Sequence, residues 1–206
     1  MALMVGEVLP LPPDHSSTYQ VFHRLATSSL TQDKVALISD ATKITYRDLL
    51  KMVDSLCVWL RRRVQETGAR CGDGGTGLTT VALCLHRSPK LVALILAVWK
   101  LGWAYVPLDP TVPALRTLYV LRDAEPACVV TDAHTSIKVR HDWSSSSSTT
   151  EEESDLTPRA GEVACVLYTS GSTGNPKGVQ LTMNNLMNRI HWQWKDCVVL
   201  WCVVLW

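Results

Sequence analysis

The sequence predicts an α/β fold, a mostly parallel sheet with helices on both faces. Segments of strand character alternate with segments of helical character along the 206 residues, an order typical of parallel strands joined by crossover helices. Expected strands such as residues 79–85 are almost uninterruptedly apolar, as they are in sheets covered on both sides. With 47% hydrophobic residues, the chain has ample material for one buried core.

A helix, a strand and a second helix are expected at the start of the chain. The first helix begins at the capping pair Ser17-Thr18, and a strand follows over 34–39. A turn is expected over 40–42, and Thr45 then caps a long helix over 46–64. The apolar stripes of the two helices consist of Val21, Phe22, Leu25, Leu49, Val53, Leu56, Leu60 and Val64.

The middle of the chain is expected to contain further strand–helix pairs. After the strand over 79–85, Ser88 is an N-cap whose following proline occupies the first helical position. The helix over 89–101 is apolar on nearly all sides, so it must be buried, and Gly102 ends it. The elements expected next are a strand over 103–106, a helix over 115–124 and a strand over 127–131.

A loop of unusual composition separates the last two expected strands, over 163–168 and 179–181. It consists of the small residues Thr169-Ser170-Gly171-Ser172-Thr173-Gly174, and Pro176-Lys177-Gly178 follows. Glycines let successive backbone N–H groups converge on one anion, while hydroxyls and an ammonium group add donors suited to phosphate oxygens. The segment therefore has the composition of a loop that binds a polyphosphate.

Two other interpretations compete with a phosphate-binding loop. A glycine and serine cluster is usually a flexible connector, but a connector between two apolar strands does not require the ending Pro-Lys-Gly. The nucleotide-binding P-loop requires Gly-Lys-Ser/Thr, whereas Lys177 lies between Pro176 and Gly178. We predict Lys177 as either a phosphate contact or an anchor of the loop. The other predicted binding residues are the hydroxyl donors Thr169, Ser170, Ser172 and Thr173 and, for close backbone approach, Gly171 and Gly174.

Residues 168–178 match every position of the signature (Y/T)-(S/T)-S-G-(S/T)-T-G-x-P-K-G. On these residues the chain resembles the adenylate-forming superfamily of AMP-dependent synthetases and ligases. Residues 44–49 are similar to its segment (L/I)TY(R/A)EL, and residues 101–110 to KAGAAYVPLDP, which is marked in amino-acid-activating members. Residues 188–194 are similar to adenylation domains of the β-alanyl-amine synthase type. The resemblance covers roughly 19–195, as in the N-terminal part of a nonribosomal-peptide-synthetase-like adenylation domain.

The resemblance implies ATP-dependent adenylation of a carboxylic acid, an amino acid in preference to a fatty acid. The acyl group would then pass to a thiol of coenzyme A or of a carrier-protein phosphopantetheine. ATP and Mg²⁺ are the implied cofactors, with the Mg²⁺ ligands mostly outside this chain. Since the family's domain is well over twice this length, the chain resembles a truncated first subdomain, expected to be inactive alone, and we assign it no catalytic or metal-binding residue. The alternatives are a non-catalytic nucleotide- or phosphate-binding module, a non-functional truncation product, or a fragment of a fatty-acyl-CoA synthetase.

Four segments are expected in the chain. Residues 1–16 form an N-terminal tail, and 17–195 belong to the adenylation domain, whose last helix begins after Thr182. Residues 144–157 contain a serine-rich low-complexity stretch that cannot bury apolar area, so they are expected to be a disordered insertion. Residues 196–206 contain a tandem repeat of CVVLW, which we interpret as an aberrant, aggregation-prone tail.

Composition restricts the partners of the protein and its location. The formal net charge is +1, which gives no indication of a nucleic-acid partner. The seven cysteines form no Cys-x-x-Cys pair, so buried reduced thiols are expected rather than disulfides or zinc ligands. The longest apolar run, 91–99, is nine residues, too short for the ~20 that span a bilayer. We therefore expect a cytoplasmic protein without a membrane partner, in which the scattered histidines are structural or solvent-facing.

Overall fold

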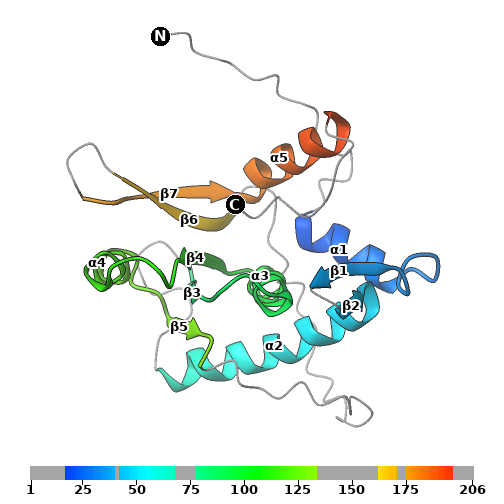
Figure 1. Ribbon diagram of the computed structural model, residues 1–206, viewed down its shortest axis with the longest axis horizontal. Helices are drawn as coiled ribbons and strands as arrows, with labels where there is room; N and C mark the ends of the chain where they lie inside the picture. Colours follow the sequence, from blue (N-terminus) through cyan, green and yellow to red (C-terminus); the bar gives the residue numbers. More distant parts are fainter. Residues whose placement is uncertain (1–16, 40–41, 68–77, 134–161, 171–174, 197–206) are drawn as a thin grey trace.

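The computed structural model describes residues 17–39, 42–67, 78–133, 162–170 and 175–196. These residues form a five-stranded sheet flanked by helices and a separate two-stranded sheet (Figure 1). In chain order the elements are α1 (Thr18–Thr27), β1 (Val35–Ser39), β2 (Thr42–Thr45), α2 (Tyr46–Glu66), β3 (Thr80–Cys84), α3 (Pro89–Lys100), β4 (Ala104–Leu108), α4 (Ala114–Ala124), β5 (Cys128–Thr131), β6 (Val163–Thr169), β7 (Lys177–Thr182) and α5 (Met183–Asp196).

The main sheet has the strand order β5-β3-β4-β6-β7. The strands β5, β3, β4 and β6 run parallel, and only β7 runs antiparallel, beside β6. After β4 the chain returns through α4 to β5 on the far side of β3, whereas β6 turns directly back into β7. The carboxyl ends of four parallel strands therefore lie along one edge of the sheet, and the predicted mostly parallel sheet is confirmed.

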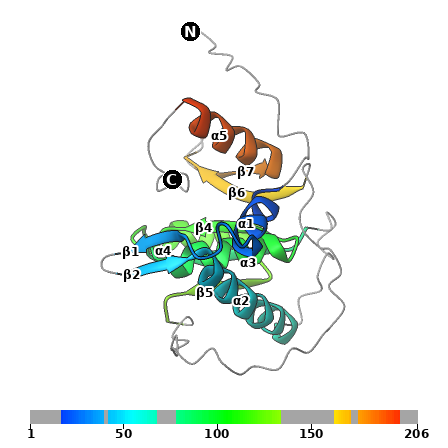
Figure 2. The same cartoon turned by 90° about the vertical axis from the view of Figure 1, so that its right-hand side faces the viewer.

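Helices cover both faces of this sheet, as predicted. On β3, Val81 and Leu83 belong to a large core that includes α1, α2 and α3. Ala82, which points to the other face, belongs to a smaller core with Val106 of β4 and Val120 of α4. The alternation follows from the two-residue period of a strand. In Figure 2, α5 lies at one end of the molecule, beyond β6 and β7, and α2 lies at the opposite end.

The ends of α3 are fixed by its own sequence. The Ser88 hydroxyl accepts a hydrogen bond from the Leu91 N–H at 3.3 Å, and a proline occupies the first turn. At the other end Gly102 has φ 70° and donates to the Trp99 carbonyl, while the Trp103 N–H donates to the carbonyl five residues earlier. These two bonds form a Schellman motif. The predicted start, end and burial of this helix are confirmed.

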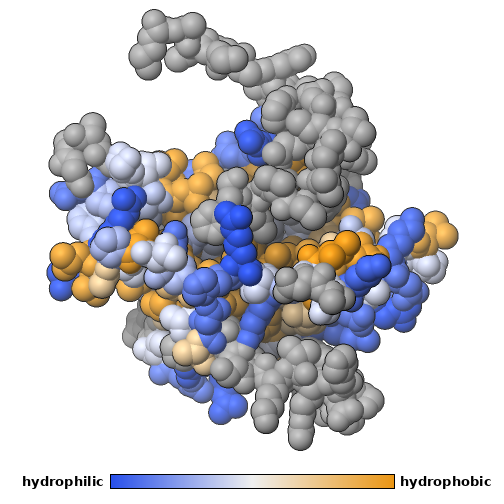
Figure 3. Space-filling view, viewed as in Figure 1, coloured by the Kyte–Doolittle hydropathy of each residue, from blue (hydrophilic) through white to orange (hydrophobic). Residues whose placement is uncertain are grey.

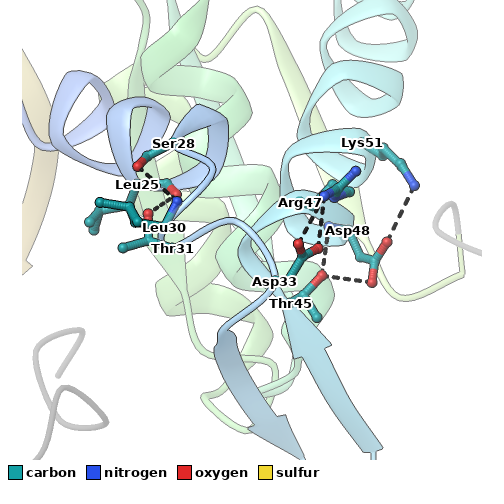
Figure 4. A network of polar contacts seen from close by, with 9 residues as sticks. All are labelled: Leu25, Ser28, Leu30, Thr31, Asp33, Thr45, Arg47, Asp48 and Lys51. Carbon is teal, nitrogen blue, oxygen red and sulfur yellow. Dashed lines mark hydrogen bonds and ion pairs between the residues drawn. The ribbon is translucent and has the colours of Figure 1, made fainter.

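Polar contacts tie the start of α2 to the preceding loop (Figure 4). The Thr45 hydroxyl accepts from the Asp48 N–H at 3.1 Å and donates to the Asp48 carboxylate at 2.8 Å. Lys51 lies 3.4 Å from the same carboxylate, and Arg47 pairs with Asp33 at 2.9 Å. Exposed ion pairs each contribute only about 0–1 kcal/mol. Here they connect the start of α2 to Asp33 in the loop before β1.

Three details differ from the sequence prediction. Residue 42 was expected in a turn, but it begins β2, which pairs antiparallel with β1. In α1 the buried side chains are Tyr19, Phe22 and Ala26, while Val21 and Leu25 are half-buried. In α5 the four-residue spacing of Leu186 and Ile190 predicts an apolar stripe at these residues, but the buried side chains are Met183 and Met187. Apart from Phe22, the predicted apolar residues of these two helices lie beside the buried ones, because tertiary packing selects one side of a broad apolar face.

Four of the seven cysteines lie in the described part of the chain, and all four are free thiols: Cys57, Cys84, Cys128 and Cys165. Burial raises the pKa of Cys57 to about 12 and that of Cys128 to about 11, so these thiols are unreactive at neutral pH. None of the described helices is long and apolar enough to cross a membrane. The tail 1–16, the insertion 144–157 and the residues 197–206 lie outside the described part.

Trp99 joins α3 to the strand that leads to the predicted phosphate loop. Its Nε1–H donates to the Ala164 carbonyl at 3.1 Å in a buried position. We expect Trp99→Phe to lower the free energy of unfolding by about 1–3 kcal/mol, because a buried acceptor loses its donor. Urea denaturation of the full chain measures this loss. Trp59→Phe, at a half-buried position on α2, is the control, and an equal loss in both variants would contradict the role of the hydrogen bond.

Candidate functional site

The predicted phosphate loop lies at the carboxyl edge of the sheet, between β6 and β7. Thr169 is the last residue of β6, and it pairs in register with Lys177, the first residue of β7. Ser170 follows Thr169, and all three side chains are exposed. One hairpin therefore brings two predicted hydroxyl donors and the predicted ammonium group to the same bend. The other predicted binding residues, Gly171, Ser172, Thr173 and Gly174, are among the residues that the structure does not describe.

The hairpin is joined to α4 by the residue just before the loop. The Tyr168 hydroxyl donates to Oδ2 of Asp123, close to the end of α4, at 2.6 Å. Burial raises the pKa of Tyr168, and the hydrogen bond to Asp123 and its charge raise this pKa further. Tyr168 is therefore a protonated donor at neutral pH.

Gly178 lies opposite Tyr168 on β7 and provides the space that the aromatic ring occupies. The two residues are partners in the strand register. A Cβ atom on Gly178 would lie 3.1 Å from Cζ of Tyr168 and 3.2 Å from Cγ1 of Val166. Among the described glycines only Gly102 has a positive φ. Gly178 is thus required for the space beside the ring and not for an unusual backbone conformation.

The neighbouring strands also end in polar side chains at this edge. Nδ1 of His86, after β3, lies 2.6 Å from Oδ2 of Asp132, after β5, and the His86 backbone N–H donates to the same oxygen at 3.3 Å. The hydrogen bond from His86 lowers the pKa of Asp132. After β4, Asp109 accepts from the hydroxyl and backbone N–H of Thr111, which lower its pKa. His86 is solvent-facing, as expected, but it also bridges two strand ends.

The chemistry of the described residues suits a phosphate group better than a metal ion. Exposed hydroxyls at Thr169 and Ser170 and the ammonium group of Lys177 are donors that match phosphate oxygens. No three His, Cys, Asp or Glu side chains within the described ranges come together in a way that could hold a metal ion.

Residues 26–205 match the family model for the AMP-binding enzyme. The chain belongs to this family. It is 40% identical over 186 residues to the beta-alanyl-bioamine nonribosomal peptide synthetase ebony of Drosophila melanogaster, an alignment that covers 79% of this chain and 21% of that protein. The family is that expected from the signature at residues 168–178.

Solved structures show the same fold. The N-terminal subdomain of Klebsiella oxytoca NpsA in complex with 3-hydroxyanthranilyl-AMSN is 26% identical with a TM-score of 0.62, over 82% of this chain and 41% of that one. NpsA-ThdA, an artificially fused adenylation–PCP di-domain from the same organism, is 25% identical with a TM-score of 0.63, over 88% of this chain and 34% of that one. The chain thus has the fold of an adenylation N-terminal subdomain, and it spans less than half the length of each of these relatives.

The bond between His86 and Asp132 predicts a pH dependence. Because the pKa of Asp132 is lowered in the folded state, the pair contributes stability above the ordinary carboxyl pKa of about 3.9. This contribution is lost as the pH falls through the lowered pKa. We expect His86→Ala to raise the pKa of Asp132 towards its ordinary value, as measured by NMR titration of the carboxyl carbon. His23→Ala, on α1, should not change it, and an unchanged midpoint in His86→Ala would refute the effect of the bond.

Proposed function

We propose that this chain provides the ATP phosphate-binding part of an enzyme that adenylates a carboxylic acid and transfers the acyl group to a thiol. Family membership and the adenylation-subdomain fold support the proposal. The observation that carries it is the pairing of Thr169 with Lys177 at the carboxyl edge of a parallel sheet. Ligands of such sheets bind beyond the carboxyl ends of the strands.

Donors at this position act on the leaving group of the reaction. When a carboxylate attacks the α-phosphate of ATP, negative charge increases on the departing pyrophosphate. Preorganised hydroxyl, amide and ammonium donors stabilise this charge at little cost in reorganisation. In this role Thr169, Ser170 and Lys177 hold the outer phosphates and orient the α-phosphate for in-line attack. The chain supplies binding and orientation, and Mg²⁺, with ligands mostly outside this chain, would neutralise further phosphate charge.

An amino acid is the acid that we propose, with a phosphopantetheine carrier as the thiol acceptor. The segment 101–110 resembles amino-acid-activating members, and one relative is a nonribosomal peptide synthetase for beta-alanyl-bioamines. Another is an adenylation domain fused to a PCP carrier. Free thiols at the four described cysteines agree with a reducing, cytoplasmic location.

The chain alone is proposed to bind ATP without catalysing adenylation. It spans 41% of the related N-terminal subdomain, and no carboxylate cluster for a metal ion occurs in its described part. Pyrophosphate exchange with a panel of amino and fatty acids tests this on the purified chain. No exchange above background is expected, and robust exchange would overturn the proposed dependence on further residues.

Lys177 provides the direct test of phosphate binding. We expect Lys177→Ala to weaken ATP binding by the full chain roughly tenfold, about 1.4 kcal/mol, because a charge-assisted hydrogen bond is lost. Isothermal titration calorimetry measures the dissociation constant. Lys43→Ala, at an exposed position on β2, is the matched control and should bind ATP as the unchanged chain does. If Lys177→Ala unfolds more easily but binds ATP equally well, Lys177 is an anchor of the loop instead of a phosphate contact.

A further inference from the structure

We propose that Asp123, Tyr168 and Gly178 form a clasp that positions both ends of the phosphate loop against α4. The inference rests on the proposed function, because it assigns these three residues as positioning residues for the donors beside them. Tyr168 directly precedes Thr169, and Gly178 directly follows Lys177. Tyr168 and Gly178 thus lie next to the paired residues Thr169 and Lys177, one on each strand of the hairpin.

The first part of the clasp is the hydrogen bond between the hairpin and α4. The Tyr168 hydroxyl reaches Oδ2 of Asp123 at 2.6 Å, a short distance typical of a charge-assisted bond. Asp123 lies in the last turn of α4. A carboxylate is disfavoured there, since the carboxyl end of a helix carries partial negative charge. Asp123 therefore does not stabilise α4 through the helix dipole, and its hydrogen bond to Tyr168 explains an aspartate at this position.

The second part of the clasp is the bare backbone of Gly178 beneath the Tyr168 ring. A Cβ atom at this position would lie 3.1 Å from Cζ and 3.3 Å from the hydroxyl oxygen of Tyr168. A Cβ atom at these distances would require the ring to shift by a few tenths of an ångström, and the ring carries the hydroxyl that reaches Asp123. Gly178 accordingly keeps the ring in the position that the hydrogen bond requires.

The arrangement of the sheet explains why the hairpin needs such a clasp. β7 is the edge strand of the sheet, and four of its six residues are exposed. β4 pairs with β6 at Tyr105 and Cys165, far from the bend, and no later pair is found along these two strands. A two-stranded hairpin is only marginally stable by itself. The bond from Tyr168 to α4 therefore adds a contact to the hairpin beyond that register pair, and a held bend binds with a smaller loss of entropy.

The consequence is a set of variants with different expected effects on the full chain. Tyr168→Phe keeps the ring and loses the hydroxyl, and Asp123→Ala loses the acceptor, so both should weaken ATP binding by roughly tenfold. Asp123→Asn keeps an amide oxygen as acceptor and should recover most of the affinity. Gly178→Ala should weaken binding in the same direction but by less than Tyr168→Phe, because a small shift of the ring lengthens the hydrogen bond without removing it. The control is Tyr119→Phe, on the same helix as Asp123, which removes a tyrosine hydroxyl but leaves both partners of the Tyr168–Asp123 bond in place.

Two measurements separate positioning from a general loss of stability. ATP titrations are made well below the melting temperature of each variant, so that every sample is folded. Amide hydrogen exchange is followed at residues 168–170 and 177–178, where Tyr168→Phe, Asp123→Ala and Gly178→Ala should exchange faster than the unchanged chain and Tyr119→Phe should not. Weaker binding together with faster local exchange, and recovery of both in Asp123→Asn, supports the clasp.

The failure of the clasp and the failure of the proposed function give different results. If the unchanged chain binds ATP and these variants bind it equally well, the positioning role is overturned. If the unchanged chain does not bind ATP, the proposed function fails, and hydrogen exchange alone decides on the clasp. Faster exchange in the variants then supports a clasp that holds the hairpin, and unchanged exchange rejects it.

Discussion

The burial of α3 on nearly every side is the constraint on which the rest of the structure depends. Eight of its twelve residues are buried, so this helix requires the sheet on one side and other helices on the other. Such a helix is stable only inside a core, because burying apolar surface provides about 25 cal/mol per Å². Its capping serine and its terminal glycine then fix where β3 ends and where β4 begins. The position of the carboxyl edge of the sheet therefore depends on residues outside the loop.

β6 is bonded to helices on both faces of the sheet, and these contacts determine where the loop that follows it begins. On one face Trp99 of α3 donates to the Ala164 carbonyl near the start of β6. On the other face the Tyr168 hydroxyl near the end of β6 donates to Asp123 of α4. The two bonds lie at opposite ends of one strand, so they fix its direction as well as its place. The positions of Thr169 and Lys177 depend on that direction, because these two residues form the last register pair before the loop.

Local signals in the sequence were sufficient for most elements of the fold. The cap at Ser88 and the stop at Gly102 depend on residues close in sequence, so both could be predicted. β2 could not be predicted, because a polar four-residue strand is defined mainly by its pairing with β1. The bonds from His86 to Asp132 and from Tyr168 to Asp123 join residues 46 and 45 positions apart, and they exist because of the strand order. No spacing rule in the sequence indicates such pairs.

Large apolar side chains are exposed on α4 and on the hairpin. Apolar side chains gather over α4 (Figure 3), where Leu115 is 82% and Leu118 is 49% exposed. On the hairpin, Leu167 and Val179 are register partners and both are exposed. The two groups lie on opposite faces of the hairpin, because Tyr168 points to α4 and the adjacent Leu167 therefore points away from it. Large exposed apolar side chains that cluster on a surface are typical of regions that pack against other protein. In the proposed enzyme, packing against this surface would exclude water beside the loop and strengthen its hydrogen bonds to phosphate. The hydroxyl and ammonium groups of Thr169, Ser170 and Lys177 thus lie on this chain, and in the proposed enzyme the water-excluding surroundings would come from protein packed against it.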